Sequence, residues 1–168
     1  FPLAVKVAPY FAAMTNMAYR LANAGADGLV LFNRFIHPDA DLNELEMTAK
    51  LTRSSPHEML EPLRWIGILR GKVNASLALT SGLHDTDGLI KALLVGADVG
   101  MIAAAVYLHG FEHVGKMLDG LRQWMEEKEY ESVEQFKGSM SREHCSDPAA
   151  FTRGSYMKAL VSYASPAI

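Results

Sequence analysis

A three-residue motif that occurs twice constrains the fold of this chain more than any other feature. Gly-Ala-Asp stands at residues 25–27 and again at residues 96–98. Each copy follows a segment whose apolar residues recur at helical spacing, and each precedes a short apolar run of strand length. The repeat therefore indicates a chain built from successive units in which a helix leads into a buried strand.

Four such units can be recognised along the sequence. Apolar runs predict strands at residues 3–8, 29–32, 75–79 and 99–104, and helical spacing predicts helices at 11–21, 58–70, 85–94 and 114–125. Alternating strands and helices form a parallel sheet with right-handed crossovers, and four units are half of the eight that close a TIM barrel. An open doubly wound sheet is the alternative, but no G-x-G-x-x-G follows the first strand. We predict the α/β class and a half barrel of the (β/α)8 family.

The remaining segments do not follow this repeat. Residues 33–57 are polar and rich in turn formers, and we expect a long loop with a short helix around residues 42–51. Beyond Tyr130 the pattern changes to short amphipathic pieces at 132–137 and 148–163. We predict two parts: the half barrel at residues 1–130 and a helical C-terminal tail at 131–168 that packs on it.

Composition limits the partners and the compartment. The net charge is −3 and the basic residues form no cluster, which argues against nucleic acid and against an anionic membrane surface. The apolar runs are too short to span a bilayer and the first residues do not resemble a signal peptide, so we expect a cytoplasmic protein. Because the chain of 168 residues opens without Met inside an apolar run, we also expect that its natural N-terminal portion is missing.

Lys6 is the first candidate for a binding role. Side chains alternate along a strand, so Lys6 shares a face with Ala4 and Ala8, and this is the face that points into a barrel. An ammonium group between two alanines has charge to satisfy and space beside it, which suits a bound anionic or electron-accepting ring. The alternative is a structural lysine paired with a carboxylate on a neighbouring strand.

Polar and small residues follow the later strands, at the end where barrels of this type place their sites. Asn33 and Arg34 come directly after the second strand and offer an amide and a bidentate cation, although either residue could instead organise the loop. Ser81-Gly82 follows the third strand and Ala103-Ala104 ends the fourth. Such turns let backbone N–H groups approach a phosphate, and they also suit close packing.

Metal and thiol chemistry have little support. His109 and His113 have the i, i+4 spacing of a ligand pair, but Gly110 interrupts them and no third ligand is evident, so we predict no metal. Cys145 is the single cysteine, which excludes an internal disulfide, and we interpret it as a tail thiol without a role.

Three segments resemble the dihydroorotate dehydrogenase family, including the barrel of dihydropyrimidine dehydrogenase. They are LAVKVAP, GADGLVLFNRF and ASLALTSGLHDTDGLIKALLVGADVGMIAAAVYLHG, within residues 3–130. The resemblance implies the fifth to eighth units of an FMN-binding barrel, a role in pyrimidine metabolism and a small pyrimidine-like substrate, and we also expect a homo-oligomer. Lys6 would approach the flavin ring and Asn33, with Arg34 beside it, would contact the substrate. Ser55, Ser81, Gly82, Ala103 and Ala104 would line the flavin phosphate and ribityl chain.

The chain departs from the family pattern at three sites, with four residues that differ. The family usually has Gly where Ser55 stands, Gly-Gly where Ser81-Gly82 stands and Gly-Thr where Ala103-Ala104 stands. An added Cβ narrows the approach to the backbone, and the missing threonine removes a hydroxyl donor. The catalytic base of the family would lie upstream of Phe1, so this chain alone is not expected to catalyse the reaction.

Three functions remain open from the sequence. The first is a flavin oxidoreductase that oxidises dihydroorotate or a related dihydropyrimidine. The second is a phosphate-binding, aldolase-like barrel in which Lys6 forms a Schiff base. The third is a degenerate, non-catalytic barrel fragment, whose open sheet edges would make it self-associate.

Overall fold

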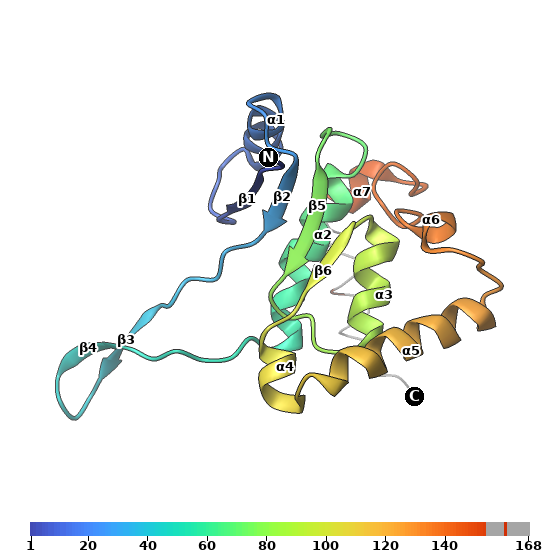
Figure 1. Ribbon diagram of the computed structural model, residues 1–168. Helices are drawn as coiled ribbons and strands as arrows, with labels where there is room; N and C mark the ends of the chain where they lie inside the picture. Colours follow the sequence, from blue (N-terminus) through green and yellow to red (C-terminus); the bar gives the residue numbers. More distant parts are fainter. Residues whose placement is uncertain (154–159, 161–168) are drawn as a thin grey trace.

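The computed structural model describes residues 1–153 and residue 160, and at its centre lies a four-stranded parallel sheet (Figure 1). The strands are β1 (Ala4–Val7), β2 (Gly28–Leu31), β5 (Ser76–Thr80) and β6 (Val99–Met101), in the order β1-β2-β5-β6. Lys6 is in register with Val30, Val30 with Ala78, and Ala78 with Val99. The predicted run of four parallel βα units, a partial (β/α)8 barrel, is therefore confirmed.

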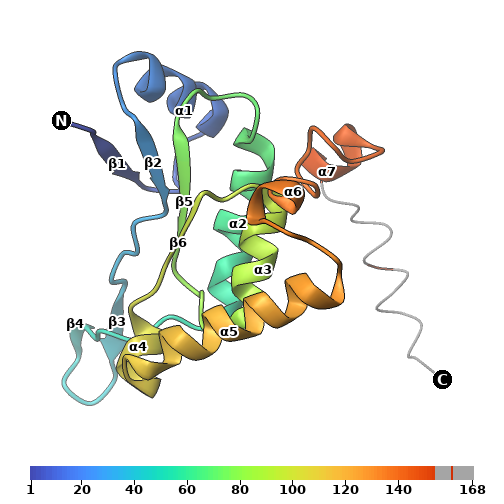
Figure 2. The same ribbon diagram turned by 45° about the vertical axis from the view of Figure 1, so that its right-hand side comes forward.

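Among the described residues, helices cover one face of this sheet and leave the other uncovered. They are α1 (Met14–Asn23), α2 (Leu60–Leu69) and α3 (Thr86–Val95), and Figures 1 and 2 show α2 and α3 side by side behind β5 and β6. The side chains of Leu29, Leu31, Leu77 and Leu79 are at most 1 % exposed and pack against buried residues of these helices. Burying a leucine side chain contributes about 2 kcal/mol, so this layer of contacts stabilises the fold.

The opposite face of the sheet is open. Ala4, Lys6 and Ser76 are exposed, and so are Val99 and Met101 on β6. The alternation expected from the sequence holds in β1, where Val7 is buried towards the helices and Lys6 lies on the other side. This open face is the one that lines the inside of a complete barrel.

The repeated Gly-Ala-Asp motif is explained by how each strand begins. Asp27 donates its backbone N–H to the Leu3 carbonyl and accepts the Leu3 N–H at Oδ2, at 2.8 and 2.7 Å. Asp98 makes the same two bonds with Leu77, at 2.8 and 2.9 Å. The aspartate thus satisfies a backbone donor on the preceding strand and fixes the register of the next one.

The short helix expected around residues 42–51 is wrong. The segment forms an antiparallel hairpin of β3 (Pro38–Asp41) and β4 (Glu46–Ala49), which projects from the body of the molecule in Figure 1. Asp41 Oδ1 accepts the N–H groups of Asn43 and Glu44, at 3.0 and 3.3 Å, and this turn ends the strand. A side chain that bonds backbone groups two and three residues ahead favours a turn over a helix.

The other predicted elements occur with small shifts of their ends. A short 3-10 helix, η1 (Pro56–Met59), precedes α2, and α5 (Glu112–Glu127) extends the helix predicted at 114–125. The Asp85 carboxylate accepts the Gly88 N–H at 2.8 Å and so caps α3. The short helix α4 (Ala104–His109) was not predicted as a separate element.

The segment after Tyr130 packs against α3 and α5. It contains α6 (Val133–Phe136) and α7 (Pro148–Arg153), and the rest of the piece expected at 148–163 lies mostly outside the described residues. Phe136 is fully buried among Ile90, Leu93 and Leu121. The division of the chain at residue 130 stays a prediction.

In the part of the chain that the structure describes, every helix is too short or too polar to cross a lipid bilayer.

Candidate functional site

A cavity of about 780 Å³ opens at the carboxyl ends of the strands, and we call it the carboxyl-end cavity. Its volume lies within the range of about 300–1,000 Å³ that is usual for small-molecule sites. Residues from every strand end and from the loop before η1 line it: Lys6, Arg34, Leu51, Thr52, Arg53, Ser54, Thr80, Ser81, Gly82, Leu83, Met101, Ala103, Ala104 and Tyr107. Five of the predicted cofactor residues, all except Ser55, are therefore brought together.

Lys6 brings a positive charge to this cavity. Its side chain lies on the open face of β1, and it makes no ion pair or side-chain hydrogen bond within residues 1–153. The neighbours in its row of the sheet, Val30 and Ala78, are apolar. An ammonium group without a carboxylate partner beside apolar walls is suited to an anionic or carbonyl-rich ligand.

The Ser81-Gly82 bend forms the floor beside β5. Both residues have positive φ angles, 75° at Ser81 and 74° at Gly82. A Cβ at Gly82 would lie 2.3 Å from the Met59 nitrogen and 2.9 Å from the Ser55 carbonyl oxygen, so only glycine fits there. The left-handed conformation of Ser81 is unfavourable for a residue with a Cβ, and it occurs where the family usually has glycine.

Ser55 is not among the residues that line the cavity, and its neighbour Ser54 takes that place. The Ser55 N–H instead donates to Glu58 Oε1 at 2.8 Å at the start of η1. Ser54 Oγ lies 3.3 Å from His84 Nε2. The contact of Ser55 with a phosphate stays a prediction. The hydroxyl of Ser54, and not that of Ser55, belongs to a residue that lines the carboxyl-end cavity.

Arg34 lines the carboxyl-end cavity but bonds to the protein. Its Nε donates to Glu58 Oε2 at 2.7 Å, and its terminal nitrogens donate to the Thr52 carbonyl and to Thr52 Oγ1. Burial raises the pKa of Glu58, but hydrogen bonds from Arg34 and Ser55 outweigh it and hold that pKa below its usual value. Glu58 is therefore an anionic partner for Arg34.

Asn33 lies in a separate, smaller cavity of about 390 Å³, which we call the side cavity. Arg34, Thr80 and Ser81 line both cavities, so the two are neighbours. Aromatic rings border the side cavity: the centroids of Tyr10 and Phe35 are 5.6 Å apart, and the Tyr10 hydroxyl lies 3.5 Å from His37 Nε2. Asn33 can thus contact a planar polar group next to a ligand that occupies the larger cavity.

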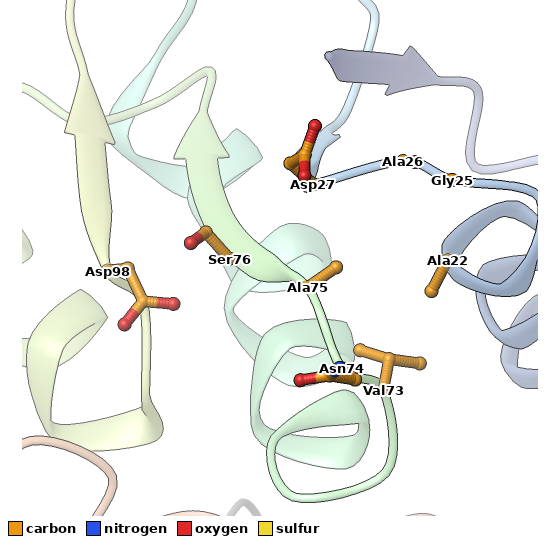
Figure 3. A pocket seen from close by; sticks show the side chains of 9 residues that line it. All are labelled: Ala22, Gly25, Ala26, Asp27, Val73, Asn74, Ala75, Ser76 and Asp98. Atoms are coloured by element: carbon orange, nitrogen blue, oxygen red, sulfur yellow. The ribbon is translucent and has the colours of Figure 1, made fainter. Parts of the chain in front are cut away.

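A third cavity of about 530 Å³, the amino-end cavity, lies where the strands begin (Figure 3). Asp27 and Asp98 lie on the turns that border it, and Figure 3 shows Ser76 between them and Asn74 below. Burial raises the pKa of Asp98, but the Leu77 N–H, Lys137 and Arg70 together hold it below its usual value. These carboxylates already have partners in the protein, so this cavity is a weaker candidate for a ligand.

The histidine pair and the cysteine make contacts within the protein. The rings of His109 and His113 have centroids 4.7 Å apart, and His113 Nε2 lies 2.7 Å from the His84 carbonyl oxygen. Cys145 Sγ donates to the Arg142 carbonyl at 3.2 Å. Among residues 1–153 and 160, three or more metal-binding side chains do not gather at any point.

Sequence reasoning missed part of the cavity wall. Thr52, Arg53 and Ser54 come from a loop with no periodic pattern, and Tyr107 comes from the unpredicted α4. A signal for Glu58 was present, since Ser55-Pro56-His57-Glu58 has the S-x-x-E spacing that marks the start of a helix. That spacing predicts the bond between Glu58 and the Ser55 N–H but not the pairing with Arg34.

Comparisons with known proteins find a relative by sequence and another by structure that are both dihydroorotate dehydrogenases. No family model matches the chain. The chain is 26% identical over 140 residues to the catalytic subunit of dihydroorotate dehydrogenase B (NAD(+)) from Pyrococcus furiosus, a match that covers 82% of this chain and 47% of that protein. Its fold is similar to a crystal structure of DHODH in complex with ferulenol from Eimeria tenella, with a TM-score of 0.64 and 18% identity over 81% of this chain and 37% of that one.

The chain thus spans about half the length of the curated relative that it matches. The structural likeness, at 18% identity, concerns the fold alone, whereas the sequence match extends over most of the chain. The sequence match is to the family that the three sequence segments resemble, and the structural likeness agrees with its fold. In sequence and in fold, the chain is therefore similar to dihydroorotate dehydrogenases.

Proposed function

We propose that this chain forms the FMN-binding part of a dihydroorotate dehydrogenase-like flavin oxidoreductase. In this proposal it supplies the fifth to eighth units of the barrel, and the catalytic base belongs to the remaining units. The substrate is dihydroorotate or a related dihydropyrimidine. The observation that carries the proposal is the gathering of Lys6, the Ser81-Gly82 bend and Ala103-Ala104 around one cavity at the carboxyl ends of the strands.

The residues present fit a flavin phosphate ester. Small residues on the inner face, such as Ala78 and Thr80, leave room for a flat ring, and the cavity volume of about 780 Å³ is sufficient for a ligand of this size. In our proposal the Lys6 ammonium faces the carbonyl-rich edge of the ring. The Ser54 hydroxyl and the backbone at Ser81 and Gly82 then bind the phosphate and the ribityl chain.

When bound, FMN supplies a ring that accepts hydride from the substrate. The residues of this chain bind and orient the two ligands. Lys6 stabilises negative charge at the ring edge that it faces. Asn33 in the side cavity holds the amide and carbonyl groups of the pyrimidine by donating and accepting hydrogen bonds.

Titration of FMN with the purified 168-residue chain tests the proposal. We expect quenching of flavin fluorescence with a Kd on the order of 10 µM, about −7 kcal/mol, because only part of the barrel contributes contacts. The same sample should show no oxidation of dihydroorotate. A chain that leaves flavin fluorescence unchanged up to millimolar concentrations of protein contradicts the proposal.

A further inference from the structure

The guanidinium of Arg34 is committed to the loop that precedes η1. Besides the bond from Nε to Glu58 Oε2 at 2.7 Å, its Nη2 lies 3.4 Å from Glu58 Oε1 and 3.0 Å from Thr52 Oγ1, and its Nη1 donates to the Thr52 carbonyl. The side chains of Arg34 and Glu58 are 32% and 35% exposed. Both edges of the planar group are thus engaged within the protein, which leaves little donor capacity for a ligand.

Glu58 connects Arg34 to the turn on which the Ser81-Gly82 bend packs. Its Oε1 accepts the Ser55 N–H at 2.8 Å, and its own N–H donates to the Ser55 carbonyl at 3.1 Å, so the turn that opens η1 is fixed at both ends. Gly82 packs directly on that turn, because a Cβ there would be 2.3 Å from the Met59 nitrogen. A continuous series of contacts therefore joins the end of β2 to the Ser81-Gly82 bend.

The same loop forms one wall of the carboxyl-end cavity through Thr52, Arg53 and Ser54. Without the Arg34 contacts, this wall is held mainly by the 3.3 Å contact between Ser54 and His84. An isolated ion pair at this exposure contributes little to stability. A guanidinium that binds a carboxylate and a backbone carbonyl together, however, fixes the position of the loop relative to η1.

We propose that Arg34 is a positioning residue and not a substrate ligand: with Glu58 it holds the Thr52–Ser54 wall and the Ser81-Gly82 bend in the shape that binds the flavin phosphate ester. This inference rests on the proposed function for the identity of the ligand. The assignment of Arg34 and Glu58 as a clamp on the loop does not depend on it.

A double-mutant cycle on FMN affinity separates the two roles of Arg34. In the full chain, Arg34→Met and Glu58→Gln should each raise the Kd for FMN about tenfold, or about 1.4 kcal/mol, and the double variant should be little weaker than either single one. Arg34→Lys should recover part of the loss, since one ammonium can bind Glu58 or the Thr52 carbonyl but not both. Arg122→Met, at an exposed arginine of α5, is the matched control and should leave the Kd unchanged.

A direct ligand role predicts the opposite for Glu58. Glu58→Gln would free the guanidinium for an anion, so an unchanged or lower Kd in that variant overturns the proposal. Glutamine has nearly the same shape as glutamate, so this variant keeps the result interpretable even if Arg34→Met folds poorly.

Limited trypsin digestion gives a second readout that needs no flavin. Cleavage after Arg53 should be at least about fivefold faster in Arg34→Met and Glu58→Gln than in the wild type, because opening of the loop no longer breaks the clamp. Equal cleavage rates overturn the inference, whatever the flavin result. Faster cleavage in the variants of a chain that does not bind FMN would support the clamp and contradict the proposed function alone.

Discussion

The two ends of the sheet use polar residues in opposite ways. At the amino end, the carboxylates of Asp27 and Asp98 accept backbone N–H groups at the start of the preceding strand. Asp98 also pairs with Arg70 and Lys137. At the carboxyl end, Lys6 lies beside a larger cavity without an ion-pair partner among residues 1–153. Polar groups that are satisfied by the protein stabilise the fold, whereas a charge left without a partner in a roomy cavity is available to a ligand.

A substitution at Gly82 should have the largest effect on stability. Gly82 lines the carboxyl-end cavity, and its positive φ and close backbone contacts admit only glycine. Gly82→Ala places a Cβ 2.3 Å from the Met59 nitrogen at a positive φ angle, and we expect a loss of about 3 kcal/mol in the free energy of unfolding. Urea denaturation measures this loss. Gly115→Ala in α5 is the control: open space surrounds that position, and alanine should stabilise the helix by about 0.5–1 kcal/mol.

The aspartates of the two Gly-Ala-Asp turns should differ in their contribution to stability. Asp98→Ala removes the bond from the Leu77 N–H and the pairing with Arg70 and Lys137, so we expect a loss of about 1–2 kcal/mol. Asp27→Ala removes only the exposed bond from the Leu3 N–H, and about 0.5–1 kcal/mol is expected. Denaturation curves should rank them in this order, and neither change should alter the affinity for FMN. An Asp27 variant that is the less stable of the two contradicts this comparison.

The pH dependence of stability should show whether the negative charge of Asp98 stabilises the fold. Its pKa in the folded protein is held below the ordinary value of 3.8, so its contribution is fully present above that pH and is lost as the pH falls through the folded pKa. The difference in the free energy of unfolding between the wild type and Asp98→Asn should therefore shrink between pH 5 and pH 2, as acid protonates the wild-type carboxylate. A difference that stays constant over this range would show that the charge of Asp98 does not stabilise the fold.

Ser81→Gly should have the smallest effect and the opposite sign. Ser81 has a φ angle of 75°, which glycine adopts without strain, so the variant should be more stable by about 0.5–1 kcal/mol. The family usually has glycine at this position, and the smaller residue should also bind FMN at least as tightly as the wild type. Thermal melting with and without FMN checks both expectations, and a lower melting temperature would contradict them.

The repeating units could be predicted from the sequence because the apolar spacing within each unit agreed with the repeat of the Gly-Ala-Asp motif. The apolar run of Leu77 and Leu79 predicted strand β5, and helical spacing predicted helix α3. The hairpin at residues 38–49 was missed because it is a short polar segment whose turn depends on Asp41 side-chain bonds. No periodicity marks such a turn.

The candidate site was only partly predictable for a different reason. Lys6 and the Ser81-Gly82 bend could be placed because strand alternation and strand ends fix their positions. The pairing of Arg34 with Glu58 joins residues 24 positions apart across a loop, and nothing in the spacing of the sequence relates them. Contacts between loops depend on the closed fold and appear only with the structure.

In our proposal the flavin binds beside Lys6 in the carboxyl-end cavity and not at the amino-end turns. FMN fluorescence titration of the wild type, Lys6→Met and Asp98→Asn tests it directly. We expect Lys6→Met to weaken FMN binding at least about tenfold with unchanged stability, because a charge-assisted contact is lost. Asp98→Asn should lower stability and leave FMN binding unchanged. Equal FMN affinity in the wild type and Lys6→Met would contradict it.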